Sequence, residues 1–226
     1  LYSSAASDVY KRQDMFQDSG LSAAALHRAR SPWRGMRTEV IGGQLLDISL
    51  EAAGSESVEL ANSVNRYKTA AYTIERPLHL GAAIAGASEE LIAAFRGYGH
   101  DIGIAYQLRD DQLGVFGDPA VTGKPAGDDL REGKRTELLA LALQRADESD
   151  PQAAATLRKL IGHTSDPQEL SRLAQIIADS GAPEEIERRI DALTRSGLQH
   201  LHAAQVDPAV TEALEQLAIK ATARRK

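Results

Sequence analysis

Residues 99–118 read GHDIGIAYQLRDDQLGVFGD, and this segment carries the clearest structural and chemical signals in the chain. Its apolar residues recur at spacings of three and four, which predicts an amphipathic helix. Gln107 precedes Asp110 by three residues and Asp111 by four, so the three side chains share one helix face. Two carboxylates near the negative end of a helix need a cation, and Mg²⁺ suits oxygen ligands. The alternative is an ordinary solvated acidic surface.

The segment that follows, residues 114–129, is glycine-rich, charged and longer than the other connections. Long loops of this kind often carry function. It includes Lys124, and the run DDLREGKRT (128–136) adds Lys134. Carboxylates, Mg²⁺ and lysines together suit a diphosphate, because the metal neutralises the oxygens that it bridges and ammonium groups bind the rest. Alternatively, both lysines simply keep the loop soluble. For Thr136 we expect the structural role, that of N-cap of the next helix.

Two further polar clusters lie upstream, each beside small residues. Lys68 and Thr69 precede a run of small and apolar residues, which places Lys68 at the edge of an expected core helix. In GGQLLD (42–47), Gln44 and Asp47 share a helix face with small residues, where a helix or a ligand can come close. The alternatives are a surface lysine whose stem covers apolar neighbours, and a polar pair buried between packed helices.

The composition of the whole chain excludes several classes of protein. Of 226 residues, 26 are Lys or Arg and 32 are Asp or Glu, so the formal charge is −6, and 42% are hydrophobic. No apolar run approaches the roughly 18 residues that suggest a membrane span, and no broad basic surface suits a nucleic acid. Cysteine is absent, which excludes disulfides, thiolate zinc sites and cysteine nucleophiles. We expect a cytoplasmic protein without a membrane span or nucleic-acid partner.

Apolar spacings of three and four continue almost throughout from Asp14 onward and predict an all-α chain. Ser31-Pro32 fits an N-cap followed by proline at the first helical position, which predicts a helix start there. The short connections between helices predict antiparallel packing. Further helices are expected at 56–85, 88–114, 136–147, 151–162, 167–180, 183–204 and 207–224.

Residues 1–13, LYSSAASDVYKRQ, have neither the order of a signal peptide nor a sustained periodicity. They resemble a translated sequencing-library adaptor, and the alternative is a frayed native terminus. We therefore expect residues 1–13 to be non-native and residues 14–226 to form part of a single helical domain.

Four segments in order resemble the trans-type polyprenyl diphosphate synthases, with the geranylgeranyl type closest. They are WRGMRTEVIGGQLLD (33–47), RYKTAAYTIERPLHLG (66–81), the 99–118 segment and TGKPAGDDLREGKRT (122–136). The resemblance covers about residues 14–226. It implies an isoprenoid-synthase-like antiparallel helical bundle and a homodimeric, Mg²⁺-dependent prenyltransferase. That enzyme condenses isopentenyl diphosphate with an allylic diphosphate to make a longer trans-prenyl diphosphate.

The same resemblance implies roles for individual residues of this chain. The implied metal ligands are Asp110 and Asp111, the implied catalytic residues are Lys68, Thr69 and Gln107, and the implied diphosphate-binding residues are Lys68, Lys124, Lys134 and, as support for the lysine-bearing loop, Asp129. The implied pocket residues are Gln44, Asp47 and Tyr106.

Two departures from the family pattern affect these expectations. Gly114 stands where the second aspartate-rich motif usually ends in a third Asp, and Asp118 is a nearby acidic substitute. The first aspartate-rich motif belongs upstream of Asp14, and residues 1–13 do not supply it. We therefore expect a C-terminal portion of a synthase, with its N-terminal helices missing and no activity alone. The alternatives are a non-catalytic subunit of a heteromeric prenyl synthase, and another helical Mg²⁺-dependent diphosphate enzyme such as a terpene cyclase.

Overall fold

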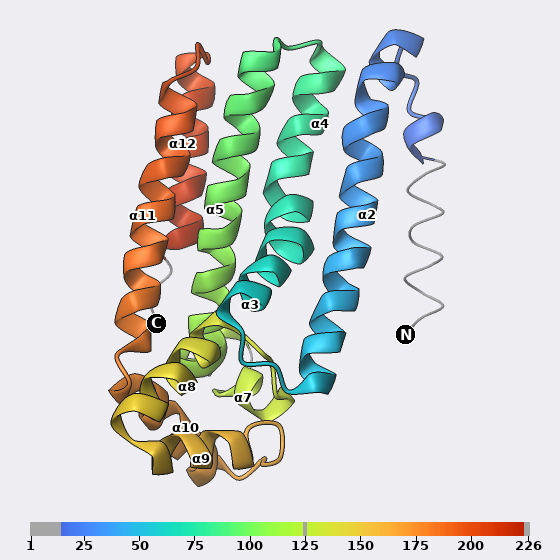
Figure 1. Ribbon diagram of the computed structural model, residues 1–226. Coiled ribbons are helices and arrows are strands. Elements are labelled where there is room, and N and C mark those ends of the chain that lie inside the picture. Colours follow the sequence, from blue (N-terminus) through green and yellow to red (C-terminus); the bar gives the residue numbers. More distant parts are fainter. Residues whose placement is uncertain (1–14, 124–125, 224–226) are drawn as a thin grey trace.

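The computed structural model describes residues 15–123 and 126–223, and every regular element in these ranges is helical. The all-α prediction is confirmed. The long helices stand side by side as a bundle, and short helices gather at its lower end (Figure 1). In chain order the elements are α2 (Ala23–Ala53), α3 (Val58–Val64), the π-helix η1 (Asn65–Glu75), α4 (Arg76–Ala85), α5 (Glu89–Phe116), α6 (Pro119–Thr122), α7 (Asp128–Glu132), α8 (Glu137–Ser149), α9 (Pro151–Leu160), α10 (Pro167–Asp179), α11 (Ala182–His202) and α12 (Pro208–Thr222).

The predicted start of the first long helix was wrong. α2 begins at Ala23, and Pro32 is buried inside it rather than at its first turn. Ser22 is the N-cap, and its hydroxyl accepts a hydrogen bond from the backbone N–H of Ala25 at 3.3 Å. Several alanines precede Pro32, and alanine has the highest helix propensity of all residues. These turns therefore form helix in spite of the hydrogen bond that Pro32 cannot donate.

Backbones approach closely at glycines where η1 meets its neighbours. A Cβ on Gly43 of α2 would lie 2.5 Å from the backbone nitrogen of Lys68. A Cβ on Gly103 of α5 would lie 2.5 Å from Cα of Ala70. No real Cβ tolerates such contacts, so only glycine permits this spacing. η1 is thus held between α2 and α5, and Lys68 lies at the contact with α2.

The main core lies between α5 and the helices at the lower end of the bundle. Leu108 on α5 packs in one buried cluster with Leu138 of α8, Leu157 of α9, Leu173 of α10 and Ile186 of α11. Each is at most 1% exposed. Burying such a side chain contributes about 1.5–3 kcal/mol. This cluster fixes the C-terminal half of α5, which carries the acidic pair. Among the described residues, no helix is long and apolar enough to cross a bilayer.

Candidate active site

Lys68 and Thr69 lie in a rare type of helix. η1 has 11 residues in π-helical conformation, whose hydrogen bonds span one residue more than those of an α-helix. Most π-helical segments are single turns, and they occur often at functional sites. Lys68 Nζ donates to Asp47 Oδ2 of α2 at 2.5 Å, with the lysine side chain 34% exposed. This ion pair gives the lysine a fixed position at the edge of the bundle.

A hydrogen-bonded chain links η1 to the acidic pair on α5. The hydroxyl of Thr69 donates to Gln107 Oε1 at 2.7 Å. The amide nitrogen of Gln107 donates in turn to Asp111 Oδ1, also at 2.7 Å. The predicted shared face of Gln107 and Asp111 therefore exists, and Thr69 orients it from the neighbouring helix.

Asp111 is the most buried carboxylate of this group. It is 3% exposed, and its Oδ2 has no hydrogen-bond partner among the described residues. Burial, assisted by the nearby Asp129 and Asp110 carboxylates, raises the pKa of Asp111 to about 8, although the Gln107 amide and Lys134 oppose the shift. Asp110 beside it is partly exposed and forms no hydrogen bond or ion pair within the described ranges. The pair therefore favours a cation.

Lys134 reaches the same place from the segment after α7. Its Nζ donates to Asp129 Oδ1 at 2.6 Å, and Asp129 is 4% exposed. Burial alone would lower the pKa of Lys134, but the hydrogen bond to Asp129 and the carboxylates of Asp111 and Asp110 raise it. Lys134 is thus a charged ammonium group. The predicted role of Thr136 as N-cap is confirmed, since its hydroxyl accepts from the Leu139 N–H at 3.2 Å.

Asp129 occupies the space that a side chain at position 114 would need. A Cβ on Gly114 would lie 2.1 Å from Asp129 Oδ2 and 2.3 Å from its Cγ. Asp118, the acidic substitute considered from the sequence, caps α6 by accepting from the Ala120 N–H at 2.8 Å. The carboxylate that fills the gap beside α5 is therefore that of Asp129.

These side chains meet around a cavity of about 60 Å³. The predicted site residues that line it are Asp47, Lys68, Thr69, Gln107, Asp111 and Lys134. Two further polar residues that were not predicted as site residues, Asn65 and Arg135, also line it. Arg135 stands beside Lys134 in the DDLREGKRT run, which could have singled it out, whereas Asn65 belongs to no such run.

Among the described residues, four predicted site residues do not line this cavity: Asp110, Asp129, Gln44 and Tyr106. Gln44 is exposed on α2 and does not line the cavity. Tyr106 lines a different groove of about 390 Å³, whose walls include Ile74 of η1 and Leu217 of α12. Lys124 lies outside the described residues. The roles of Gln44, Tyr106 and Lys124 stay predictions.

The residues present fit a magnesium ion. No group of three or more His, Cys, Asp or Glu side chains among residues 15–123 and 126–223 forms a closed metal site. Mg²⁺ keeps several of its waters, however, and usually binds one or two carboxylates together with substrate phosphates. The unpartnered oxygen of Asp111 and the adjacent Asp110 supply such a donor set.

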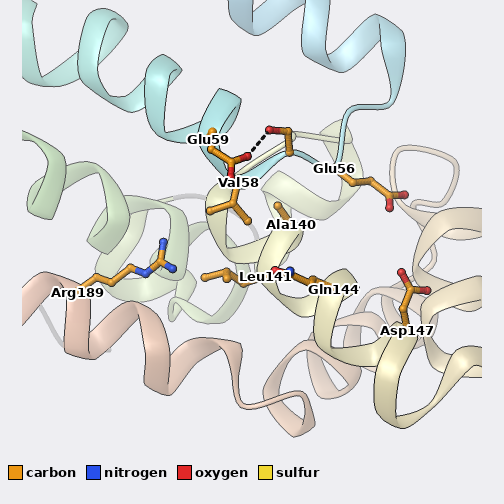
Figure 2. Close-up of a pocket in the computed structure, with 9 residues that line it drawn as sticks. Glu56, Val58, Glu59, Ala140, Leu141, Gln144, Asp147 and Arg189 are labelled. Carbon is orange, nitrogen blue, oxygen red and sulfur yellow. Dashed lines mark hydrogen bonds between the residues drawn. The ribbon is translucent and has the colours of Figure 1, made fainter.

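A larger cavity, of about 450 Å³, lies between α3, α8 and α11 (Figure 2). Its charged groups already have partners. Arg158 pairs with Glu56 at 2.7 Å and with Asp147 at 2.6 Å, and Arg189 pairs with Glu137. The charged groups of this cavity are thus engaged within the protein, so the smaller cavity is the better candidate site.

Known proteins are similar to this chain in sequence. A family model described as Polyprenyl synthetase matches residues 28–179. The geranylfarnesyl diphosphate synthase of Aeropyrum pernix is 40% identical over 129 residues, which are 56% of this chain and 40% of that protein. The geranylgeranyl diphosphate synthase of Mycobacterium tuberculosis is 40% identical over 113 residues, which are 50% of this chain and 32% of that protein.

The fold has solved counterparts. A crystal structure of geranylgeranyl pyrophosphate synthase from Corynebacterium glutamicum, complexed with isoprenyl diphosphate and magnesium, matches with a TM-score of 0.94 and 63% identity. The match covers 96% of this chain and 61% of that one, so this chain spans less than two thirds of the length of these relatives. The family model covers more than half of the chain. The chain belongs to the polyprenyl synthetase family.

Proposed function

We propose that this chain carries the second aspartate-rich motif and the diphosphate-binding lysines of a trans-prenyltransferase. Its substrates are isopentenyl diphosphate and an allylic diphosphate, and its product is a longer trans-prenyl diphosphate. The observation that carries the proposal is the convergence of Lys68, Lys134 and the Thr69–Gln107–Asp111 chain on one small cavity. The family membership and the named relatives support it.

The reaction begins when the carbon–oxygen bond of the allylic diphosphate breaks. The leaving diphosphate gains negative charge, which Lys68 and Lys134, both on the wall of the cavity, would neutralise. The allylic carbocation needs fixed dipoles and little water, and the hydroxyl of Thr69 and the amide of Gln107 supply oriented dipoles. The double bond of isopentenyl diphosphate then attacks the cation, which moves the positive charge to the internal carbon of that double bond. The leaving diphosphate takes a proton from the carbon next to this centre, and an alkene forms.

The acidic pair has a separate task in this scheme. Asp110 and Asp111 would hold Mg²⁺, which supplies charge neutralisation to the diphosphate when it is bound. Gln107 donates a hydrogen bond to one oxygen of Asp111, while the other oxygen is buried and has no hydrogen-bond partner among the described residues. The amide thus fixes the orientation of the carboxylate.

Ligand binding to the 226-residue chain tests the proposal. Isothermal titration with isopentenyl diphosphate and with a non-ionisable thiolo analogue of an allylic diphosphate should show saturable binding that needs Mg²⁺. Lys134→Ala should weaken that binding at least tenfold, because it removes a charge from the cavity. Lys159→Ala is a matched control, since Lys159 is exposed on α9. Absence of Mg²⁺-dependent binding would reject the enzyme and favour a non-catalytic subunit.

We propose that turnover also needs a first aspartate-rich motif, which residues 14–226 do not contain. A fusion can take that motif from the Corynebacterium glutamicum relative, because that protein is 63% identical over the shared part. The fusion should incorporate labelled isopentenyl diphosphate into a longer prenyl diphosphate. Conversion of the allylic diphosphate to a hydrocarbon without isopentenyl diphosphate would instead identify a terpene cyclase.

We also propose, from the family resemblance, that the complete protein is a homodimer and acts in the cytoplasm. Light scattering coupled to gel filtration of the fusion should give twice its chain mass. A monomer that condenses the two substrates would reject the dimer and leave the activity standing.

A further inference from the structure

The wall of the cavity carries a third cation that the proposed reaction does not use. Arg135 lines the cavity together with Lys68 and Lys134. It stands directly before Thr136, the N-cap of α8, and that residue lines the cavity as well. Like charges around so small a space repel one another unless negative charge lies near them. The source of that negative charge differs among the three cations.

Both lysines have carboxylate partners within the protein. Lys68 pairs with Asp47 at 2.5 Å, and Lys134 pairs with Asp129 at 2.6 Å. Arg135, by contrast, forms no hydrogen bond or ion pair with any residue that the structure describes. The lysines therefore share their charge with protein carboxylates, whereas the charge of Arg135 is left for another anion.

Packing holds the guanidinium group of Arg135 in place without occupying its donors. Its Nε is buried, and a Cβ on Gly54, the C-cap of α2, would lie 3.6 Å from its Nη2. The partial negative charge at the end of a helix favours a cation there. The hydrogen bond from Arg158 and, more weakly, the charge of Arg135 lower the pKa of Glu56, but that carboxylate bonds to Arg158. Arg135 is thus positioned and still unpaired in the described ranges.

We propose that Arg135 binds a diphosphate at the mouth of this cavity, with its guanidinium group donating two hydrogen bonds to phosphate oxygens. The planar fork of a guanidinium matches two oxygens of a phosphate, whereas a lysine offers a single point charge. The side chains of Lys68 and Lys134 are 34% and 30% exposed, so the cavity is open to an anion on their side. That the diphosphate belongs to an isoprenoid substrate rests on the proposed function, whereas the anion site does not.

Isothermal titration of the 226-residue chain with inorganic pyrophosphate, in EDTA and in Mg²⁺, tests the proposal. The parent chain should bind pyrophosphate saturably. Arg135→Gln keeps much of the stem and removes the charge, so it should weaken binding about 10- to 100-fold, which corresponds to the loss of a charged hydrogen bond. Absence of saturable binding by the parent in both buffers would overturn the proposal. An affinity of Arg135→Gln within about twofold of the parent's would also overturn it.

Arg135→Lys separates anion binding from a purely structural role at the end of α2. Lysine also supplies a positive charge there, so this variant should unfold at the same urea concentration as the parent. It lacks the planar fork, so its pyrophosphate binding should stay at least about threefold weaker. Affinity equal to the parent's would refute the paired hydrogen bonds. Arg195→Gln is the matched control, because Arg195 is exposed on α11 and does not line the cavity.

Isoprenoid diphosphates distinguish this inference from the proposed function. Pyrophosphate binding that depends on Arg135, without binding of isopentenyl diphosphate or of the thiolo analogue, would reject the proposed function and support the anion site. Binding of those two ligands to Arg135→Gln with the parent's affinity would leave the proposed function standing and refute the role of Arg135.

Discussion

Replacing Gly114 by aspartate, the residue usual at this place in the related synthases, should weaken the protein instead of completing its site. Gly114 lies on α5, and the carboxylate of Asp129 from α7 fills the space beside it. The added Cβ would lie 2.1 Å from Asp129 Oδ2, about 1.3 Å short of the 3.4 Å of ordinary contact. Asp129 would have to retreat, and its 2.6 Å hydrogen bond to Lys134 would break.

The magnitude follows from two opposing effects. Loss of a hydrogen bond between charged groups costs about 1.5–3 kcal/mol. Replacing a helical glycine by alanine contributes about 1 kcal/mol in helix propensity. Gly114→Ala should therefore lower the free energy of unfolding by about 0.5–2 kcal/mol. Gly114→Asp should lower it by about 2–4 kcal/mol, because it also places a third like charge near Asp129 and Asp111.

Urea unfolding monitored by circular dichroism measures these changes. Gly81→Ala on α4 is the control, since nothing lies within 4 Å of a Cβ there, and it should gain about 1 kcal/mol. Combining Gly114→Asp with Asp129→Gly should recover at least about 1 kcal/mol relative to the sum of the single changes. If Gly114→Ala stabilises the chain as Gly81→Ala does, the contact with Asp129 does not exist and the reasoning fails.

Three further outcomes follow from the site. The pKa of Asp111 is raised to about 8 in the folded chain from its ordinary value of 3.8, so the stability that its bound proton contributes is full below about pH 4 and is lost as pH rises to about 8. In EDTA, Asp111→Asn should therefore gain on the parent by ~1.4 kcal/mol per pH unit between pH 5 and 8 in urea unfolding, and a constant difference would contradict the shift. Gly43→Ala should destabilise by about 1–3 kcal/mol and weaken diphosphate binding, because its Cβ would lie 2.5 Å from the backbone of Lys68. Asp110→Asn in the fusion should lower turnover by several orders of magnitude with an unchanged circular dichroism spectrum, whereas full turnover would remove Asp110 from the metal site.

The spacing of apolar residues in the sequence predicted a helix accurately where one apolar face of the helix packs against the hydrophobic core. α5, predicted at 88–114, runs from Glu89 to Phe116, because its apolar spacing and its Ser88 N-cap are local signals. The start of α2 was missed because Ser31-Pro32 fits the start of a helix, whereas the alanines before it extend the helix back to the N-cap Ser22. Helix spacing alone gives no sign that a run such as 65–75 adopts the π form.

The site was predictable to the extent that its members share one helix. Gln107 and Asp111 are four residues apart, and their contact follows from helix geometry. Contacts between helices were not predictable in this way. The pairing of Lys68 with Asp47 depends on how closely η1 approaches α2, and the insertion of Asp129 beside Gly114 depends on how closely α7 approaches α5. Asn65 gave no signal, because one buried amide in a helix resembles any surface asparagine until its burial is known.

The π-helical form of η1 makes the candidate site sensitive to insertions and deletions as well as to substitutions. An α-helix turns by about 100° per residue, so one residue more or fewer rotates everything beyond it by that angle. Removal of the exposed Thr73, downstream of Lys68 and Thr69, would leave both residues in the sequence. It would nevertheless change the register between η1 and α4, and with it the face that the helix presents to α5. In homologous chains, the number of residues between Lys68 and the end of α4 is therefore as much a part of the site as the lysine itself.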